Sequence, residues 1–157
     1  RSEVGSADLR ALKDAGAGDF TFWLAHSKTE QSGGDRPENY KPVVDEAAQA
    51  LRAWLQAAGI TDGAMFRRVR KGGHVGEALS AAAVRDIVKE RCKLAGLDGD
   101  FSAHSLRSGF VTEAGRQNVS LADTMALTGH RSVDSVVGYA RAGRGHQTAR
   151  RLLTQSS

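Results

Sequence analysis

The run GHRSVDSVVGY at residues 129–139 places a histidine and a tyrosine nine residues apart near the end of this chain. Gly129 is a residue that commonly ends helices, and Ser132 is a residue that commonly begins them. The run therefore predicts a turn between two helices. We expect His130 in that turn, and Tyr139 on the short helix that follows it.

Tyr139 is predicted to lie off the apolar side of its helix. At ~100° per residue, that side consists of Val133, Val136, Val137 and Ala140. A tyrosine that only filled the core would lie among these residues, whereas one outside them is available for chemistry. Two simpler interpretations stay open: Tyr139 as an amphipathic surface residue, and His130 as a partner for the carbonyls at a helix end.

A second basic pair lies upstream, in the run HSLRSGF at residues 104–110. A spacing of three on a helix puts His104 and Arg107 on one side. The pair is expected at the edge of a core stripe formed by Leu106, Phe110 and Ala114. From this edge the two side chains can point into a cleft. A partly buried histidine beside a salt-bridged surface arginine is the simpler alternative.

The rest of the chain predicts a small sheet followed by helices. Strands are expected at residues 7–13, 19–26 and about 36–43, and the prolines of the last strand confine it to an edge or to short pairing. A turn is expected at residues 32–35. Residues 64–79 are interpreted as irregular or as a short hairpin. Helices are expected at about 44–58, 81–95, 102–116 and 120–128.

Composition limits the function without naming it. The chain has 157 residues, the size of one domain, and its 40% hydrophobic and 25% charged residues are typical of a soluble globular protein. The net charge of +4 permits a polyanionic partner but does not demonstrate one. The single cysteine, Cys92, excludes an intrachain disulfide and fits a reducing compartment. The sequence contains no membrane-spanning run, zinc-type cluster, carboxylate cluster for magnesium or phosphate-binding loop.

Taken in order, these residues resemble the tyrosine recombinases, the phage-type integrase family. That family has a His-x-x-Arg motif, a Gly-His pair about two dozen residues later, and a tyrosine nine residues after that. His104 with Arg107, Gly129 with His130, and Tyr139 match this order. The family also has a lysine on a hairpin. Lys28, in the run Ser-Lys-Thr beside a glycine turn, matches it.

The family's first motif, Arg-x-x-Glu, is matched in its second half only. Glu3 takes the acidic position, and the arginine position falls directly before Arg1, which itself lies one place too late. The resemblance thus predicts a catalytic domain over residues 1–157 that is truncated at its N-terminus and lacks the N-terminal core-binding domain. It implies an α+β fold, mainly α-helical. A small antiparallel three-stranded sheet would lie beside a helical catalytic core, as in DNA breaking-rejoining enzymes.

The resemblance implies site-specific DNA recombination or integration. Tyr139 would attack a DNA phosphodiester, form a 3′-phosphotyrosine bond and release a 5′-hydroxyl, which a second strand's 5′-hydroxyl then reverses. The bond energy is conserved, so no cofactor and no metal is required. A type IB topoisomerase-like strand transferase and an inactive DNA-binding fragment are the alternatives.

The residue types suit this chemistry. Arg107 can donate two N–H bonds to a phosphate, and His130 can donate one. Lys28 would protonate the leaving oxygen, His104 would assist as a donor or in proton transfer, and Glu3 would orient its basic neighbours. Each role is one that the resemblance implies.

Double-stranded DNA is the implied partner, with a tetramer assembled on it and no membrane contact. A bacterial or phage-encoded protein of this kind would act in the cytoplasm, at the nucleoid. Contacts would be mainly to phosphates, which position the protein without specifying sequence. An ordinary solvated charge is an equal alternative for each candidate, and the candidates are Arg67, Arg68, Arg70, Lys71, Arg131, Arg141 and Arg144.

Overall fold

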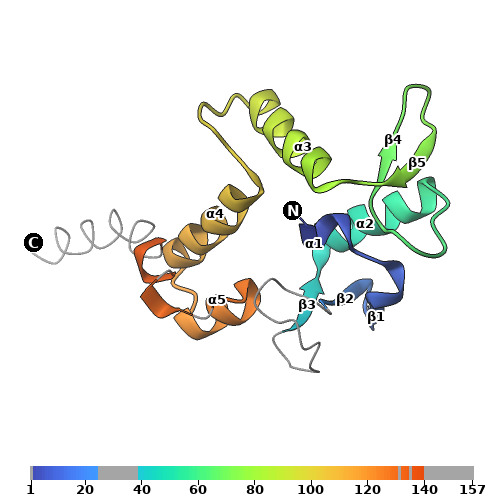
Figure 1. Ribbon diagram of the computed structural model, residues 1–157. Coiled ribbons are helices and arrows are strands. Elements are labelled where there is room, and N and C mark those ends of the chain that lie inside the picture. The colour runs from blue at the N-terminus through green and yellow to red at the C-terminus, as the bar shows by residue number, and fades with distance from the viewer. Residues whose placement is uncertain (1, 25–38, 131, 135, 140–157) are drawn as a thin grey trace, which may run out of the picture. The chain divides into compact units, whose positions relative to one another are not determined.

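A computed structural model of the chain describes residues 2–24, 39–130, 132–134 and 136–139. The chain divides into two compact units, Arg1–Asp98 and Gly99–Ser157. The first contains both sheets and the second is helical in its described part (Figure 1). The mixed α+β class expected from the sequence is confirmed.

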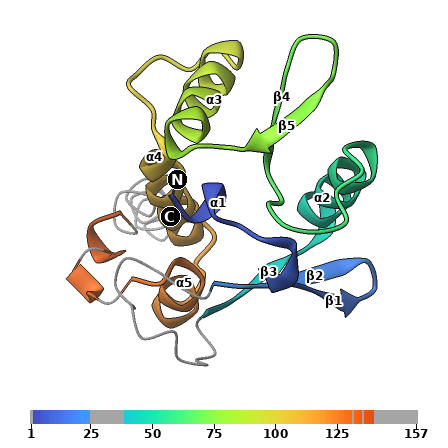
Figure 2. The ribbon, with the colours of Figure 1, turned by 45° about the vertical axis from the view of Figure 1, so that its right-hand side comes forward.

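The first unit opens with a short helix, α1 (Ser2–Gly5), and a 3-10 helix, η1 (Leu9–Ala11). Three antiparallel strands follow: β1 (Leu12–Gly16), β2 (Asp19–Trp23) and β3 (Tyr40–Val43), with β2 in the middle (Figure 2). The predicted three-stranded sheet is therefore confirmed. Its third strand lies at an edge, where the missing N–H of a proline costs no ladder bond.

The strand predicted at residues 7–13 is wrong in its position. The Asp8 side chain accepts a hydrogen bond from the Arg10 backbone N–H at 2.9 Å. This cap starts the 3-10 helix, so the strand begins only at Leu12. The end of the second predicted strand, the turn at residues 32–35 and the start of the third strand lie outside the described residues.

Helix α2 (Asp45–Ala57) packs against the sheet. Its buried residues are Ala48 and Leu51, and the neighbouring Ala47 is exposed. The indole Nε1 of Trp54 donates to the Met65 carbonyl at 2.8 Å, and thus ties the helix to the following loop. Leu51 and Met65 are central to the core of this unit.

A hairpin of β4 (Arg67–Val69) and β5 (Val75–Ala78) follows, which confirms the hairpin alternative for residues 64–79. Helix α3 (Ala81–Leu94) begins at residue 81, as predicted. The residue before it, Ser80, caps the helix, and its Oγ accepts from the Ala83 N–H at 3.1 Å. Within the described residues, Val84 is the only buried residue of α3.

The second unit contains α4 (Ala103–Arg116), α5 (Leu121–Thr128) and helical residues at 133–134 and 136–139. The predicted starts are confirmed by the caps. Ser102 forms a capping box with Ser105, and the Ser120 Oγ accepts from the N–H of the third helical residue. None of the helices in the described ranges has the length and apolarity needed to cross a membrane.

The core of the second unit corrects the predicted stripe of α4. Leu106 and Phe110 are 60% and 46% exposed, while Val111 is fully buried and Ala114 nearly so. Val111 packs with Val136, Leu121 and Met125. The buried face of α4 is therefore rotated toward Val111, because α5 and the helical residues after it pack on that face.

Candidate active site

Arg107 and His130 meet in the second unit. The Arg107 Nε donates to the His130 Nε2 over 3.4 Å, a long hydrogen bond between residues 23 positions apart. Both side chains are half-buried. A guanidinium always donates and never accepts, so the His130 Nε2 must present its lone pair in this state. The two residues that the sequence motifs predict as phosphate donors are thus brought together.

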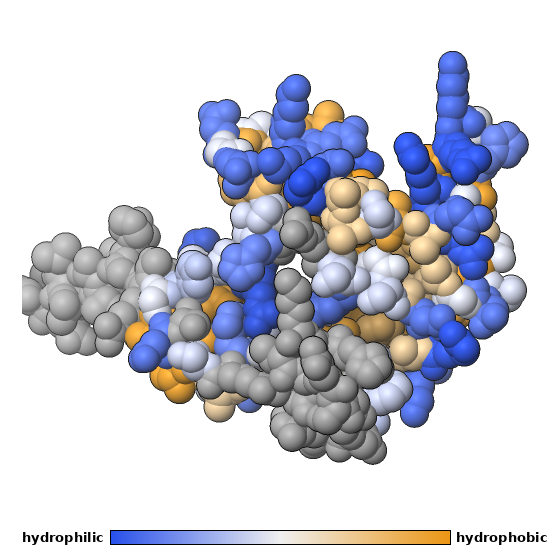
Figure 3. All heavy atoms as spheres, viewed as in Figure 1, coloured by the Kyte–Doolittle hydropathy of each residue, from blue (hydrophilic) through white to orange (hydrophobic). Residues whose placement is uncertain are grey.

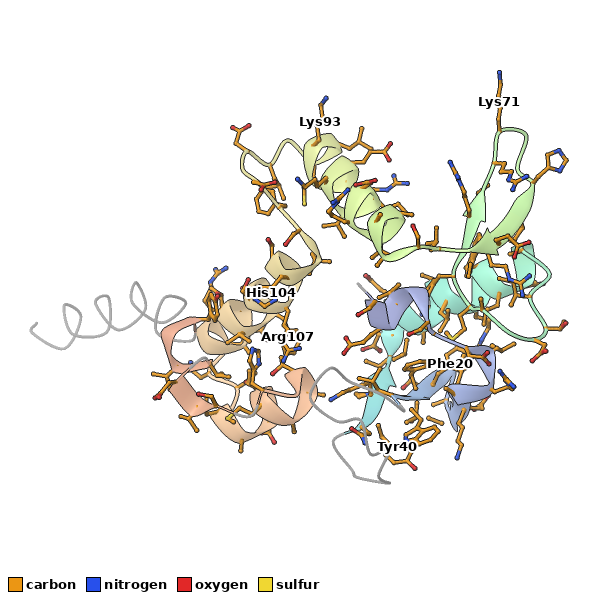
Figure 4. The ribbon with its side chains drawn as sticks, viewed as in Figure 1. Phe20, Tyr40, Lys71, Lys93, His104 and Arg107 are labelled. Atoms are coloured by element: carbon orange, nitrogen blue, oxygen red, sulfur yellow. The ribbon has the colours of Figure 1, made fainter. Side chains whose placement is uncertain are left out.

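Helix α4 explains how Arg107 is placed. Arg107 lies one turn before Val111, on the buried face, rather than at the edge of a Leu106 stripe as the sequence predicted. His104 lies one turn further back and is exposed (Figure 4). The rotation of α4 therefore gives Arg107 a half-buried position and leaves His104 accessible.

His130 occupies the predicted turn. Gly129 ends α5 in the left-handed conformation, with φ of 65°, and His130 follows at once. Partial burial lowers the pKa of His130 below its usual range, and the positive charges of Arg107 and His104 lower it further. The neutral imidazole is therefore favoured while no anion is present. A phosphate entering the site would reverse this effect, because its negative charge favours the imidazolium.

Tyr139 lies off the core, as predicted. Its side chain is 42% exposed, whereas Val136, three residues earlier, is fully buried against Val111. The prediction that Val133 belongs to the apolar stripe is wrong, because that residue is 50% exposed. Arg107 and Tyr139 each lie within about one turn of the Val111–Val136 contact, so one core cluster positions both helices that carry them.

The remaining predicted catalytic residues, Glu3 and Lys28, are not among the described residues of the second unit. Glu3 is a half-buried residue of α1, in the first unit. Lys28 lies outside the described residues, as do three candidate DNA contacts, Arg131, Arg141 and Arg144.

The basic residues of the β4–β5 hairpin differ in their contacts. Arg67 is committed to its own loop, because its Nε donates to the Ala64 carbonyl at 3.0 Å and its Nη2 to the Asp62 carbonyl at 2.8 Å. Arg68, Arg70 and Lys71 are exposed. Hydrophilic side chains gather over this hairpin (Figure 3), and Lys71 projects away from it (Figure 4).

The sequence reasoning missed Thr128. Its Oγ1 lies 2.7 Å from the His130 Nδ1, the nitrogen on the other side of the ring from Arg107. The available signal was its spacing, since a hydroxyl two residues before a turn histidine can reach the ring. Among the described residues, no group of three or more histidine, cysteine, aspartate or glutamate side chains could hold a metal ion.

Comparison with known proteins agrees with these motifs. A model of the phage integrase family matches residues 11–146. An integrase/recombinase xerD homolog of Selenomonas ruminantium is 36% identical over 127 residues, which cover 78% of this chain and 37% of the relative. The chain thus spans little more than a third of that protein.

Two solved recombinase structures share the fold. XerA recombinase aligns with a TM-score of 0.67 at 19% identity, over 95% of this chain and 51% of XerA. The XerH site-specific recombinase, in a post-cleavage complex with its palindromic difH substrate, aligns with a TM-score of 0.63 at 20% identity. That alignment covers 99% of this chain and 41% of XerH.

Proposed function

The chain belongs to the phage integrase family, and on this premise we propose that it is the catalytic part of a site-specific tyrosine recombinase. The observation that carries the proposal is the contact between Arg107 and His130, in the unit that also holds an exposed Tyr139. These residues supply two phosphate donors and a nucleophile. The position of the remaining arginine is proposed to fall directly before Arg1.

The proposed step is a phosphoryl transfer. The Tyr139 Oη bonds to phosphorus, and the bond from phosphorus to the 5′ oxygen breaks. The phenol proton passes to a neighbouring base, for which His104 is the candidate, and Lys28 gives a proton to the leaving 5′ oxygen. Arg107 and His130 stabilise the charge that grows on the phosphate oxygens. Attack by a second 5′-hydroxyl reverses every bond change.

Double-stranded DNA is the proposed substrate, and we propose that several copies, four in the complete assembly, act on it together. The exposed Leu106 and Phe110 of α4 supply apolar surface for contacts between copies. Such a protein would work at the bacterial nucleoid. Relaxation of plasmid DNA without recombinant product would instead favour a topoisomerase-like strand transferase.

The test is covalent trapping on nicked DNA. The chain, with an arginine added directly before Arg1, is incubated at low salt with a pool of nicked duplexes of randomised sequence. Cleavage beside a nick releases a short strand that diffuses away, so the protein stays attached. We expect an adduct on a denaturing gel, and we expect EDTA to leave its yield unchanged, because no proposed step uses a metal.

The matched control carries an alanine in place of the added arginine. Removal of one phosphate donor typically lowers the rate about 10²–10³-fold, so this control should form adduct more slowly by that factor. Absence of adduct from both proteins, with DNA binding retained, would leave only a DNA-binding role. A strict requirement for magnesium would contradict the mechanism.

The hairpin is proposed to contact DNA phosphates. Replacing Arg68, Arg70 and Lys71 together with alanine should weaken binding to all DNA sequences similarly. Each lost phosphate contact removes about 0.9 from the slope of log affinity against log salt, so the slope should become shallower by about 2–3. Fluorescence anisotropy over a range of salt concentrations measures both quantities.

Lys13 of β1 supplies a control for the hairpin, because it is also exposed and lies in the same unit. Lys13→Ala should leave the slope within about 0.3 of the unmodified chain, well under the 0.9 expected for one phosphate contact. An unchanged slope in the triple variant would show that the hairpin does not touch the backbone of DNA.

A further inference from the structure

We propose that Thr128 is a positioning residue that holds His130 with its proton on Nδ1, so that the Nε2 lone pair faces Arg107 and the phosphate site. This inference rests on the proposed function, because it assigns a task to His130 in that reaction. The Thr128 hydroxyl contacts the His130 ring at Nδ1, on the side away from Arg107. Its effect on the reacting atoms therefore passes through the ring.

The hydrogen bonds of the Thr128 hydroxyl show which group donates in its contact with His130. The Thr128 Oγ1 donates to the Thr124 carbonyl at 2.6 Å, and the same oxygen lies 2.7 Å from the His130 Nδ1. A hydroxyl has one proton. With that proton given to the carbonyl, Thr128 can only accept from the imidazole, and the His130 Nδ1 must carry a hydrogen.

The opposite side of the ring gives the same answer independently. The Arg107 Nε is a donor and lies 3.4 Å from the His130 Nε2, which must therefore be unprotonated when the ring is neutral. If Thr128 instead donated to the imidazole, the proton would move to Nε2 and two N–H groups would face each other. Thr128 and Arg107 thus select one tautomer together.

As a consequence, the His130 imidazole can donate a hydrogen bond to an entering phosphate without rotating. As an anionic phosphate enters, solvent can supply a proton to the His130 Nε2, and the lowered pKa of His130 would rise. The Arg107 Nε–H then leaves the His130 Nε2 and donates to the phosphate, and the new Nε2–H donates to another phosphate oxygen, while the Nδ1–H stays on Thr128. Fixing the other ring nitrogen with a hydrogen bond is a general means of orienting a functional histidine.

The test is the tautomer of His130 in the chain as it exists, read from ¹⁵N NMR of labelled histidine. The chain has five histidines, and comparison with His130→Gln assigns the signal. The unmodified chain should show the Nδ1–H tautomer alone. In Thr128→Val, the Nδ1–H loses its acceptor while the side chain keeps its shape. Only the long 3.4 Å contact with Arg107 then selects the tautomer, so we expect a mixture of tautomers. The unmodified tautomer pattern should return in Thr128→Ser.

Thr112→Val is the matched control, because the Thr112 Oγ1 also donates to a helix carbonyl, that of Ser108, at 3.0 Å. It should leave the His130 signals unchanged. A wild-type Nε2–H tautomer, or a pure Nδ1–H tautomer in a folded Thr128→Val, would overturn the proposal.

Kinetics separate this inference from the proposed function. At saturating DNA, Thr128→Val should form adduct about 10-fold more slowly, as for the loss of other groups that orient a functional histidine. The DNA concentration that gives the half-maximal rate should change less than about 2-fold, because Thr128 does not touch the DNA in this proposal. Thr128→Ser should restore the rate. Failure of the chain with the added arginine to form any adduct would refute the recombinase proposal and leave the tautomer assignment standing. Normal adduct formation with an unaltered tautomer in Thr128→Val would refute the inference alone.

Discussion

Replacing Tyr139 with phenylalanine should abolish the covalent adduct with nicked DNA. The substitution removes the one oxygen that is proposed to bond to phosphorus, and no other group in the proposed site can take its place. Loss of a catalytic nucleophile lowers rates by roughly 10⁴–10⁶-fold, which here means a fall to background. Denaturing gels over a long time course, calibrated with diluted wild-type reaction, measure the remaining yield.

Folding and DNA binding should survive this substitution. The Tyr139 side chain is 42% exposed and the ring is kept, so the Val136 contact that positions the helix is not disturbed. The expected result is therefore a protein with wild-type thermal unfolding and wild-type DNA affinity but no adduct. Reduced binding in step with reduced adduct would instead give Tyr139 a structural role.

Tyr40 is the matched control, since the chain has only two tyrosines. It lies on β3, opposite Trp23 in the sheet of the first unit. Tyr40→Phe should form adduct at the wild-type rate. An adduct that persists in Tyr139→Phe and disappears in Tyr40→Phe would show that the nucleophile had been assigned to the wrong residue.

Helix ends could be predicted from the sequence because they depend on neighbouring residues. Ser102 and Ser120 accept hydrogen bonds from N–H groups two or three residues ahead, and Gly129 ends α5 with a positive φ. These interactions are complete within a few residues, so the same local chemistry operates in any surrounding structure. The positions of α4 and α5, and of His130 between them, followed from these caps.

The buried face of α4 could not be predicted in the same way. Leu106 and Phe110 are more hydrophobic than Ala114, and a periodic pattern chosen by hydrophobicity places them inside. The structure buries Val111 instead, because the partner is Val136, a residue 25 positions later. Which face of a helix is covered depends on the shape and position of what packs on it, and the local pattern does not contain that information.

The same distinction applies within the candidate site. The motif spacing predicted Arg107 and His130 as members of one site, and the structure gives them a direct contact. The motif did not include Thr128, whose relevance depends on where its hydroxyl proton goes. The Thr124 carbonyl, one turn earlier, answers that question, because it accepts the hydroxyl proton. A residue such as Thr128 bonds to a functional side chain on the side away from the substrate and is not part of the family's motif. Such residues are found by following hydrogen bonds in the structure.

Arg107→Lys should lower the rate of adduct formation about 10²–10³-fold at saturating DNA. Lysine retains the positive charge, so DNA affinity should change little, but it lacks the planar fork that donates two parallel N–H bonds to a phosphate. The loss should therefore appear in the rate of the chemical step, measured by single-turnover trapping. The exposed Arg116 of the same helix, which pairs with Glu113 at 3.0 Å, provides the control Arg116→Lys, with an expected change of less than 2-fold.

Arg107→Ala provides a second test, the pKa of His130, which does not depend on activity. The positive charge of Arg107 is one cause of the lowered pKa of His130, so its removal should raise that pKa toward the usual range. The rise should be incomplete, because partial burial and His104 continue to act. NMR titration of His130 measures it. If the pKa of His130 rises and the adduct rate stays at the wild-type value, the contact between Arg107 and His130 is real but has no part in the chemistry. If the rate falls and the pKa does not move, Arg107 acts on the phosphate without the proposed contact to His130.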